Sequence, residues 1–170
     1  LDPSPNLEHL SPAEGRAAIR HEAASVAGTP LALGEVREMT VAGAAGPLPA
    51  RLFVPHERLG DTGSPLLIFF HGGGWVVGDR NSHDAPCRML ARSAGVRVLS
   101  VEYRLAPEHR YPAAADDAYA AFADVHANPS RYGADPVHVK EAAELLAKAK
   151  RPVIYAGQGI HYAKAWPQLK

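Results

Sequence analysis

The stretch that decides the fold is "LLIFFHGGGWVVGDR", residues 66–80. Its first five residues are apolar without alternation, which is typical of a strand covered on both faces in a parallel sheet. Three consecutive glycines, Gly72 to Gly74, follow almost directly. Glycine loses more backbone freedom on folding than any other residue, so three in a row indicate a place where bare backbone approaches a ligand. In open α/β sheets, ligand sites gather at the carboxyl ends of strands.

Upstream of this stretch the sequence predicts a helix and a hairpin. Residues 11–28 form the helix, because Ser11 and Glu14 can make a capping box. Its apolar face would consist of Ile19, Ala23 and Val26. Residues 34–43 and 50–55 read as strands joined by a turn at "GPLP", residues 46–49, and proline places this hairpin at the sheet edge.

Downstream, helices and strands alternate. A helix starts near Asn81–Asp84, carries Met89 and Leu90, and ends near Gly95. Residues 96–103 form a strand, a proline-broken loop follows, and residues 113–127 form a helix. Its apolar face would consist of Ala118, Phe122 and Val125. The order of these elements predicts an α/β fold with a mostly parallel sheet, an N-terminal antiparallel hairpin and flanking helices.

The glycines fit the chemistry of acyl transfer. Negative charge develops on the carbonyl oxygen in that reaction, and two backbone N–H groups can stabilise it. We expect Gly73 and Gly74 to donate them, with His71 and Gly72 shaping the turn. A strand followed by His-Gly-Gly-Gly is the form this device takes in lipases and esterases. The alternatives are a tight turn without a ligand and a phosphate site, but the spacing matches neither G-x-G-x-x-G nor the P-loop.

Composition limits the kinds of partner and the location that we expect for this protein. Eighteen Lys and Arg balance eighteen Asp and Glu, which gives no indication of nucleic acid binding. No apolar stretch approaches a membrane span, and no secretory signal is visible. The single cysteine, Cys87, favours a reducing, cytoplasmic location, and the histidines show no metal-ligand spacing. We expect no cofactor and no metal. The chain begins with Leu1, so we expect a fragment or a processed form.

Three longer motifs resemble one family. "HGGGWVVGDRNSHD", "VLSVEYRLAPEHRYPAAADDA" and "RYGADP" look like the hormone-sensitive-lipase group of α/β-hydrolases, over residues 7–136. The resemblance implies a partial α/β-hydrolase fold. Residues 1–34 would form a cap region and residues 35–136 the N-terminal half of the core.

By the same resemblance, Gly73 and Gly74 form an oxyanion hole, and Tyr103 and "RLAPE" brace the loops. Asp116 and Asp117 would lie in the helix before the nucleophile strand. Glu102 stands where the family usually has aspartate, so the charge is kept.

The nucleophile is missing from this pattern. The family continues after "DP" into a strand with Gly-Asp-Ser-Ala-Gly, and its acid and histidine lie further on, beyond residue 170. The 170 residues contain no Gly-x-Ser-x-Gly. The serines outside such a context read as cap, helix-surface, strand and loop residues: Ser82, Ser93, Ser100 and Ser130. His83 and His109 read as polar loop residues rather than bases.

Residues 137–170 change in character and predict a helix-strand-helix tail of foreign type. From residue 138 they are similar to the central domain of thiamine-diphosphate-dependent enzymes of the acetolactate synthase group. That domain is not where those enzymes bind thiamine. We expect residues 153–156 to pair with the strand at 98–102, which would put Gly159 in the nucleophile's position. An unpaired sheet edge would otherwise favour self-association.

The sequence thus predicts the N-terminal half of a carboxylic ester hydrolase that works on small esters through an acyl-enzyme, inactive alone because the serine is absent. The first alternative is a non-catalytic fragment or chimeric scaffold that serves as an interaction module. The second, a fragment of a thiamine enzyme, is supported by the tail only.

Overall fold

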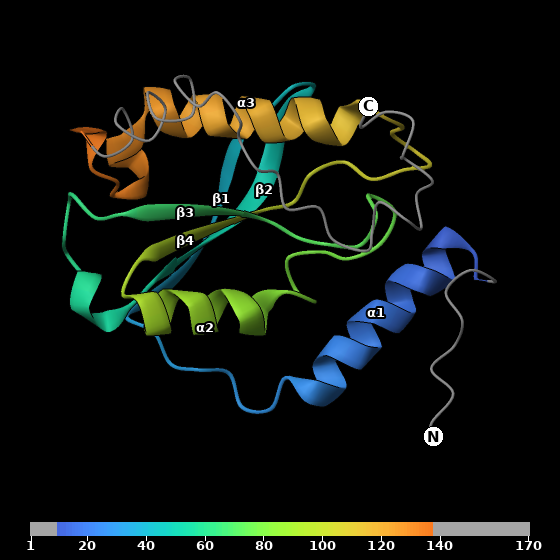
Figure 1. Cartoon of the computed structure of the whole chain (residues 1–170), viewed down its shortest axis with the longest axis horizontal. Helices are drawn as coiled ribbons and strands as arrows, with labels where there is room; N and C mark the ends of the chain where they lie inside the picture. Colours follow the sequence, from blue (N-terminus) through green and yellow to red (C-terminus); the bar gives the residue numbers. More distant parts are fainter. Residues whose placement is uncertain (1–9, 138–170) are drawn as a thin grey trace, which may run out of the picture.

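A computed structural model describes residues 10–137 of the chain (Figure 1). The elements in chain order are α1 (Pro12–Val26), β1 (Glu35–Gly43), β2 (Gly46–Val54), η2 (His56–Arg58), β3 (Leu66–Phe70), α2 (Asp84–Ala94), β4 (Arg97–Val101), α3 (Ala113–Ala127) and η3 (Pro129–Tyr132). The predicted tail of foreign type, residues 138–170, lies outside the described residues. None of the helices in the described part is long and apolar enough to cross a membrane.

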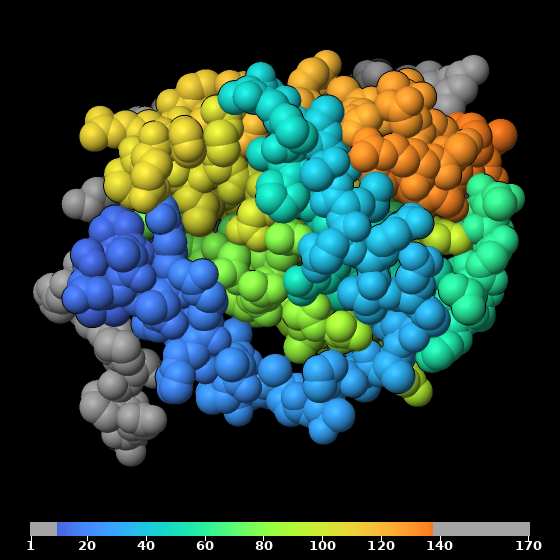
Figure 2. Space-filling model, turned by 180° about the vertical axis from the view of Figure 1, so that it is seen from behind, coloured from blue at the N-terminus to red at the C-terminus, as the bar shows by residue number. Residues whose placement is uncertain are grey.

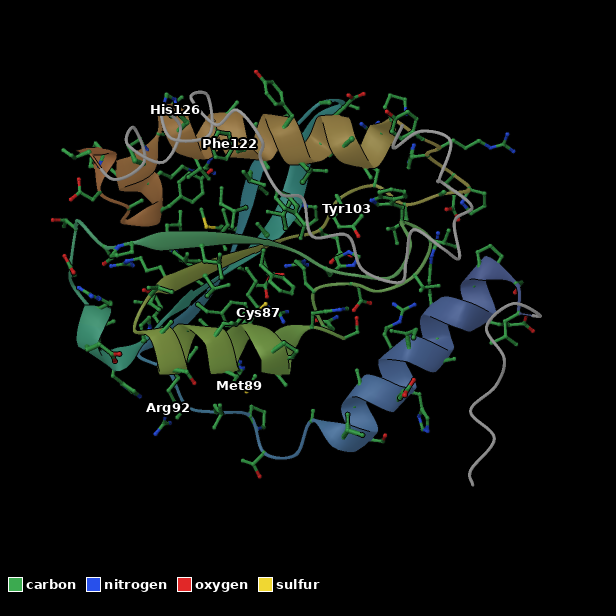
Figure 3. The ribbon with its side chains drawn as sticks, viewed as in Figure 1. Cys87, Met89, Arg92, Tyr103, Phe122 and His126 are labelled. Carbon is green, nitrogen blue, oxygen red and sulfur yellow. The ribbon has the colours of Figure 1, made fainter. Side chains whose placement is uncertain are left out.

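One sheet lies between two helices. Figure 1 shows α3 over one face of the sheet and α2 over the other. The α3 face buries Ala121 and Val125 against Leu52 and Leu99, and the α2 face buries Cys87 and Ala91 against strand residues. In Figure 3, Cys87 points from α2 toward the sheet, whereas Met89 and Arg92 point away. Met89, which the sequence places in this helix, is 55% exposed.

The sheet has the strand order β1-β2-β4-β3. β1 and β2 form the predicted antiparallel hairpin, β2 pairs antiparallel with β4, and β3 pairs parallel with β4. The sheet is therefore mixed, and among the described strands only β3 and β4 are parallel. The predicted hairpin turn at residues 46–49 is wrong, because Gly43 pairs with Gly46 and the turn lies at Ala44–Ala45.

The turn was predicted in the wrong place because of two prolines. Pro47 and Pro49 lie inside β2, opposite Ala42 and Thr40 of β1. The register between β2 and β4 starts only at Ala50, so this part of β2 has one strand neighbour and behaves as an edge. Proline is tolerated at such edge positions because no ladder hydrogen bond is required from it.

Helix α1 begins as predicted. Ser11 is the N-cap, and it forms a capping box with Glu14. The predicted apolar face is wrong at Val26, which is 78% exposed, and Gly15 is the buried residue of the helix. Figure 1 shows the reason: α1 lies beside the loops at one end of the sheet and does not cover a sheet face.

Strand β4 lies in the interior of the sheet, with β2 on one side and β3 on the other. The predicted pairing of residues 153–156 with the strand at 98–102 is therefore wrong for that strand, since both of its edges are occupied. Residues 153–156 and Gly159 lie outside the described residues. Among the described strands β3 has β4 as its only neighbour. Ser64, which precedes β3, forms an isolated parallel bridge with Ala134.

Candidate active site

The glycine loop, residues 71–78, leaves the carboxyl end of β3. Gly73 has φ +128°, Gly74 +61° and Trp75 +62°, so three successive residues have positive φ. The N–H groups of Val76 and Val77 both donate to the carbonyl of Gly73, at 3.2 and 3.0 Å, which closes the loop on itself. A Cβ on Gly73 would overlap the carbonyl of Val77, so only glycine fits there.

The loop leaves backbone donors free. Within residues 10–137, no group accepts a hydrogen bond from the N–H of Gly73, Gly74 or Trp75. Backbone N–H groups that follow one another through a turn of this kind form concavities that bind anions. The structure thus brings together the glycines predicted from sequence and adds Trp75, whose positive φ the sequence did not indicate.

His71 is fixed by Tyr103, which follows β4. The two rings stack with centroids 4.3 Å apart, and the Tyr103 hydroxyl donates to the His71 carbonyl at 2.5 Å. Nδ1 of His71 lies 2.9 Å from the carbonyl of Gly72. Burial lowers the pKa of His71, so its imidazole stays neutral, with Nδ1–H as the donor to Gly72. These contacts hold the start of the glycine loop and support the bracing role assigned to Tyr103 by resemblance. Figure 3 shows Tyr103 near the same end of the sheet.

The segment after β4 supports the far side of the loop. The N–H of Ala106 donates to the carbonyl of Trp75 at 2.8 Å. Glu102 accepts hydrogen bonds from the backbone N–H and the Nε of Arg80, both at 3.0 Å. The carboxylate of Glu102 therefore fixes the chain just beyond the glycine loop.

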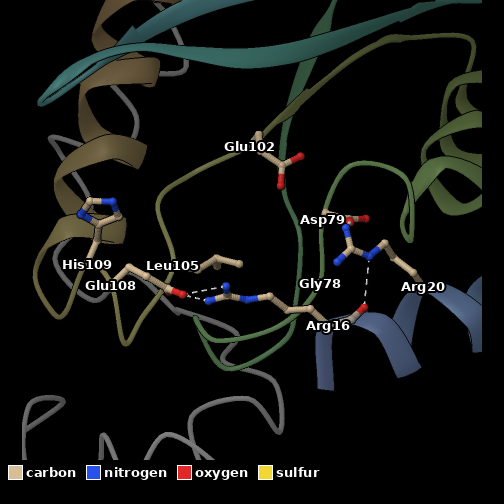
Figure 4. A pocket seen from close by; sticks show the side chains of 8 residues that line it. All are labelled: Arg16, Arg20, Gly78, Asp79, Glu102, Leu105, Glu108 and His109. Carbon is tan, nitrogen blue, oxygen red and sulfur yellow. Dashed lines mark hydrogen bonds and ion pairs between the residues drawn. The ribbon is translucent and has the colours of Figure 1, made fainter. Parts of the chain in front are cut away.

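A pocket of about 390 Å³ opens between α1 and the loops after β3 and β4 (Figure 4). Its lining residues are Arg16, Arg20, Gly78, Asp79, Glu102, Leu105, Glu108 and His109. Two ion pairs cross it, Arg16 with Glu108 and Arg20 with Asp79. The lining is mostly charged, and the glycine loop forms part of it through Gly78.

The four serines singled out from the sequence lie beside a turn, on a helix surface, in a strand and in a short helix, and the Oγ of Ser82 lies 3.1 Å from Nδ1 of His83. Ser82 bonds the backbone of Asp79, Ser93 is exposed on α2, Ser100 is buried in β4 and Ser130 lies in η3. Cys87 is fully buried, and burial raises the pKa of its thiol to about 11, which keeps it protonated.

The histidines and aspartates singled out from the sequence lie in or next to the helices α2 and α3. His83 precedes α2 and His109 lies in the loop before α3. Asp116 and Asp117 lie in α3, as predicted, and Asp117 is buried and accepts hydrogen bonds from Arg104 and from the N–H of Ala44. Nowhere in residues 10–137 do three His, Cys, Asp or Glu side chains gather as metal ligands.

Arg16 was missed by sequence analysis. It lies on α1, sixty residues from the glycine loop, and its Nε donates to the carbonyl of Val76 at 2.8 Å. A charged residue on an amphipathic helix reads as solvent-exposed, and no local pattern indicates a long-range contact of this kind.

The fold and the glycine loop together define the class: the chain has part of an α/β-hydrolase fold, whose four described strands form a mixed sheet with helices on both faces. A family model described as alpha/beta hydrolase fold matches residues 67–140. The match includes the glycine loop, β4 and α3.

Several relatives are named as esterases. The chain is 49% identical over 106 residues to the carboxylic ester hydrolase LipN of Mycobacterium tuberculosis, which is 62% of this chain and 27% of LipN. It is 44% identical over 100 residues to the esterase LipI of the same organism, 59% of this chain and 31% of LipI. A solved ester hydrolase from the metagenome of Lake Arreo superposes with a TM-score of 0.74 at 32% identity, covering 85% of this chain and 50% of that one. The chain thus spans half or less of each of these proteins, and the matches support its resemblance to the hormone-sensitive-lipase group.

Proposed function

We propose that this chain carries the oxyanion-stabilising part of a carboxylic ester hydrolase of the hormone-sensitive-lipase group. The observation that carries the proposal is the set of backbone donors at Gly73, Gly74 and Trp75, at the carboxyl end of β3. The similarity to LipN and LipI supports an ester as the substrate.

In the proposed mechanism Gly73 and Gly74 donate their N–H groups to the oxygen of the tetrahedral intermediate. Each donor of this kind contributes about 3 kcal/mol to the stabilisation of the transition state. His71 and Gly72 set the direction of the loop, and the stacked Tyr103 keeps His71 in place. The substrates we expect are small esters with short acyl chains, hydrolysed through an acyl-enzyme.

The attacking group of that mechanism is a serine that these 170 residues do not supply in a Gly-x-Ser-x-Gly context. We therefore expect negligible esterase turnover from this chain alone. The division into a cap region at residues 1–34, a core at residues 35–136 and a foreign tail at residues 137–170 is part of the same proposal, as is the resemblance of residues 138–170 to thiamine enzymes.

A titration tests the oxyanion assignment without requiring turnover. Butyrate, added to the ¹⁵N-labelled chain, is expected to shift the amide signals of Gly73 and Gly74, because a carboxylate oxygen resembles the oxyanion. Butyramide, of the same shape and no charge, is the control and should shift them far less. Equal responses to both ligands, or none at either glycine, would reject the proposal.

Turnover is measured in parallel with p-nitrophenyl butyrate. We expect no hydrolysis above background and no labelling by a serine-directed fluorophosphonate. A labelled side chain in the described residues would show a nucleophile that the geometry does not indicate, and would overturn the predicted inactivity.

The second candidate is an interaction module that associates with a second copy through β3. The observation that favours it is the edge of β3 that lacks a described neighbour strand, beside Leu67 at 41% exposure. Apolar strands with an open edge are templates for pairing between chains. Sedimentation velocity decides: a monomer across micromolar concentrations contradicts this candidate, and a dimer that dissociates on dilution supports it.

We also propose that the protein works in the cytoplasm and without a nucleic acid partner. The buried single thiol of Cys87 and the balanced charge support this. Retention on a heparin column at physiological salt would contradict the second part.

A further inference from the structure

Helix α1 docks on the glycine loop mainly through polar contacts. Gly15 is its buried residue, and a Cβ there would stand 3.2 Å from the side chain of Val77. Val26 is exposed, so the helix has little apolar surface against the core. Figure 2 shows α1, in blue, against the yellow segment that precedes α3. The contacts that orient α1 therefore come from its arginines.

Arg16 joins α1 to two separate segments. Its Nε donates to the carbonyl of Val76 at 2.8 Å, and its Nη2 donates to the carbonyl of Ala106 at 2.8 Å. The same guanidinium forms a two-pronged pair with Glu108, at 3.0 and 2.7 Å (Figure 4). A planar guanidinium holds several acceptors in a fixed geometry, which a lysine ammonium cannot reproduce.

The two segments held by Arg16 are also joined to each other by a backbone hydrogen bond. The N–H of Ala106 donates to the carbonyl of Trp75, next to the carbonyl of Val76 that Arg16 holds. The N–H of Val76 in turn donates to the carbonyl of Gly73. These hydrogen bonds connect Arg16, through the turn at Trp75, to Gly73, whose own N–H is free.

We infer that Arg16 is a positioning residue that fixes the outer side of the glycine loop and so the direction of its free N–H groups. The inference rests on the proposed function. Because a positive φ at a residue with a Cβ is strained, the turn at Trp75 needs support from its surroundings. Arg16 supplies that support from α1, while Tyr103 holds the other end of the loop at His71.

Amide hydrogen exchange of the full chain tests the inference. The variants are Arg16→Ala, Arg16→Lys and, as a matched control on the same helix, Arg20→Ala. Arg20 pairs with Asp79 at 3.3 Å and is 53% exposed, and no hydrogen bond connects it to a carbonyl of the glycine loop. We expect Arg16→Ala to speed exchange at Val76 and Val77 about tenfold, since hydrogen bonds from a charged donor are lost. Exchange in β4 should stay the same, Arg16→Lys should fall between, and Arg20→Ala should match the wild type.

Butyrate titration of the same variants adds a readout that overall stability does not move. A loosened loop is less preorganised, so the dissociation constant measured at Gly73 and Gly74 should rise about threefold or more in Arg16→Ala. Should Arg16→Ala fail to fold, Arg16→Lys and Glu108→Gln decide, both expected to change exchange at Val76 and Val77 in the same direction.

The two proposals fail separately. If butyrate does not shift the amide signals of Gly73 and Gly74 in the wild-type chain, the proposed function is overturned. The exchange data then still decide the role of Arg16. Wild-type chain that binds butyrate, together with unchanged exchange and affinity in the Arg16 variants, overturns the positioning role. Equal effects from Arg20→Ala also overturn it, because they would show a general docking contribution of α1.

Discussion

In the two parallel strands β3 and β4, the more apolar strand is the more exposed one. β3 is "LLIFF", entirely apolar, yet Leu67 is 41% exposed and its other residues are only partly buried. β4 is "RVLSV", with a charge and a hydroxyl, and every residue is buried. β4 has strand neighbours on both sides, and within the described residues β3 has one. Position in the sheet, rather than hydropathy, decided which strand is covered.

Even the charge in β4 is accommodated. Arg97 is 5% exposed, and its guanidinium donates to the hydroxyl of Ser64 at 3.1 Å and to the carbonyl of Arg58 at 2.9 Å. A buried charge is tolerable when its donors find partners. The interior strand therefore carries polar groups that a hydropathy pattern would place at the surface.

The largest effect on stability should come from truncating a leucine in β4, and the same truncation in β3 should have a much smaller effect. Leu99→Ala removes a fully buried side chain of β4 and should lower the free energy of unfolding by about 2–5 kcal/mol. Leu67→Ala in β3 should cost about 1 kcal/mol or less, because much of the side chain is already in water. Urea unfolding measures both. Equal losses would break the comparison and mean that β3 is as well covered as β4.

A smaller effect is expected in the loop that follows β3. Gly73→Ala places a Cβ against the carbonyl of Val77 at a positive φ, and strain of this kind costs about 1–3 kcal/mol. Gly72→Ala is the matched control, since the nearest atom to its Cβ would be Nε2 of His83 at 3.9 Å. Thermal unfolding should separate the two, and a neutral Gly73→Ala would show that the loop conformation is not required for folding.

The third effect depends on pH and concerns the contact that joins the ends of the two strands. The buried imidazole of His71 has a lowered pKa, so below the unfolded value of about 6.5 the unfolded chain takes up a proton that the folded chain resists. Stability should fall as the pH drops through and below this value. His71→Asn keeps a donor for the carbonyl of Gly72 and should flatten that part of the curve relative to wild type.

The same pair of proteins at pH 8 provides the reference, because His71 is neutral there in both states. A wild-type curve that is as flat below pH 6.5 as the variant's would contradict the burial of this histidine. Urea midpoints at closely spaced pH values are sufficient for the comparison.

The smallest effect on stability should come from a charge on the open strand. Leu67→Lys should change the free energy of unfolding by only about 0.5 kcal/mol, as is usual for surface positions. Lysine on an edge strand opposes pairing between chains, so any self-association should weaken. Sedimentation velocity at high protein concentration measures this. A variant that associates as strongly as wild type would mean that the association uses another surface.

Local signals in the sequence were sufficient for most elements. The capping box at Ser11 and Glu14, the helix at residues 113–127 and the hairpin were predicted, because each depends on neighbouring residues. The hairpin turn was displaced because prolines read as turn residues, and the edge position that admits them in β2 depends on where β4 pairs. The exposure of Val26 was missed for a similar reason, since it depends on which neighbours helix α1 has.

The sequence by itself determined the class of fold and the position of the glycine loop, because an apolar strand followed by His71 and three glycines has few physical explanations. The oxyanion chemistry of that loop stays a prediction. The tertiary structure alone decided that β4 is interior and β3 is an edge of the described sheet, and that Arg16 reaches the carbonyls of Val76 and Ala106. Short-range rules act through bond geometry and hydrogen bonds between near neighbours. Contacts between residues sixty or ninety positions apart exist only once the chain has packed.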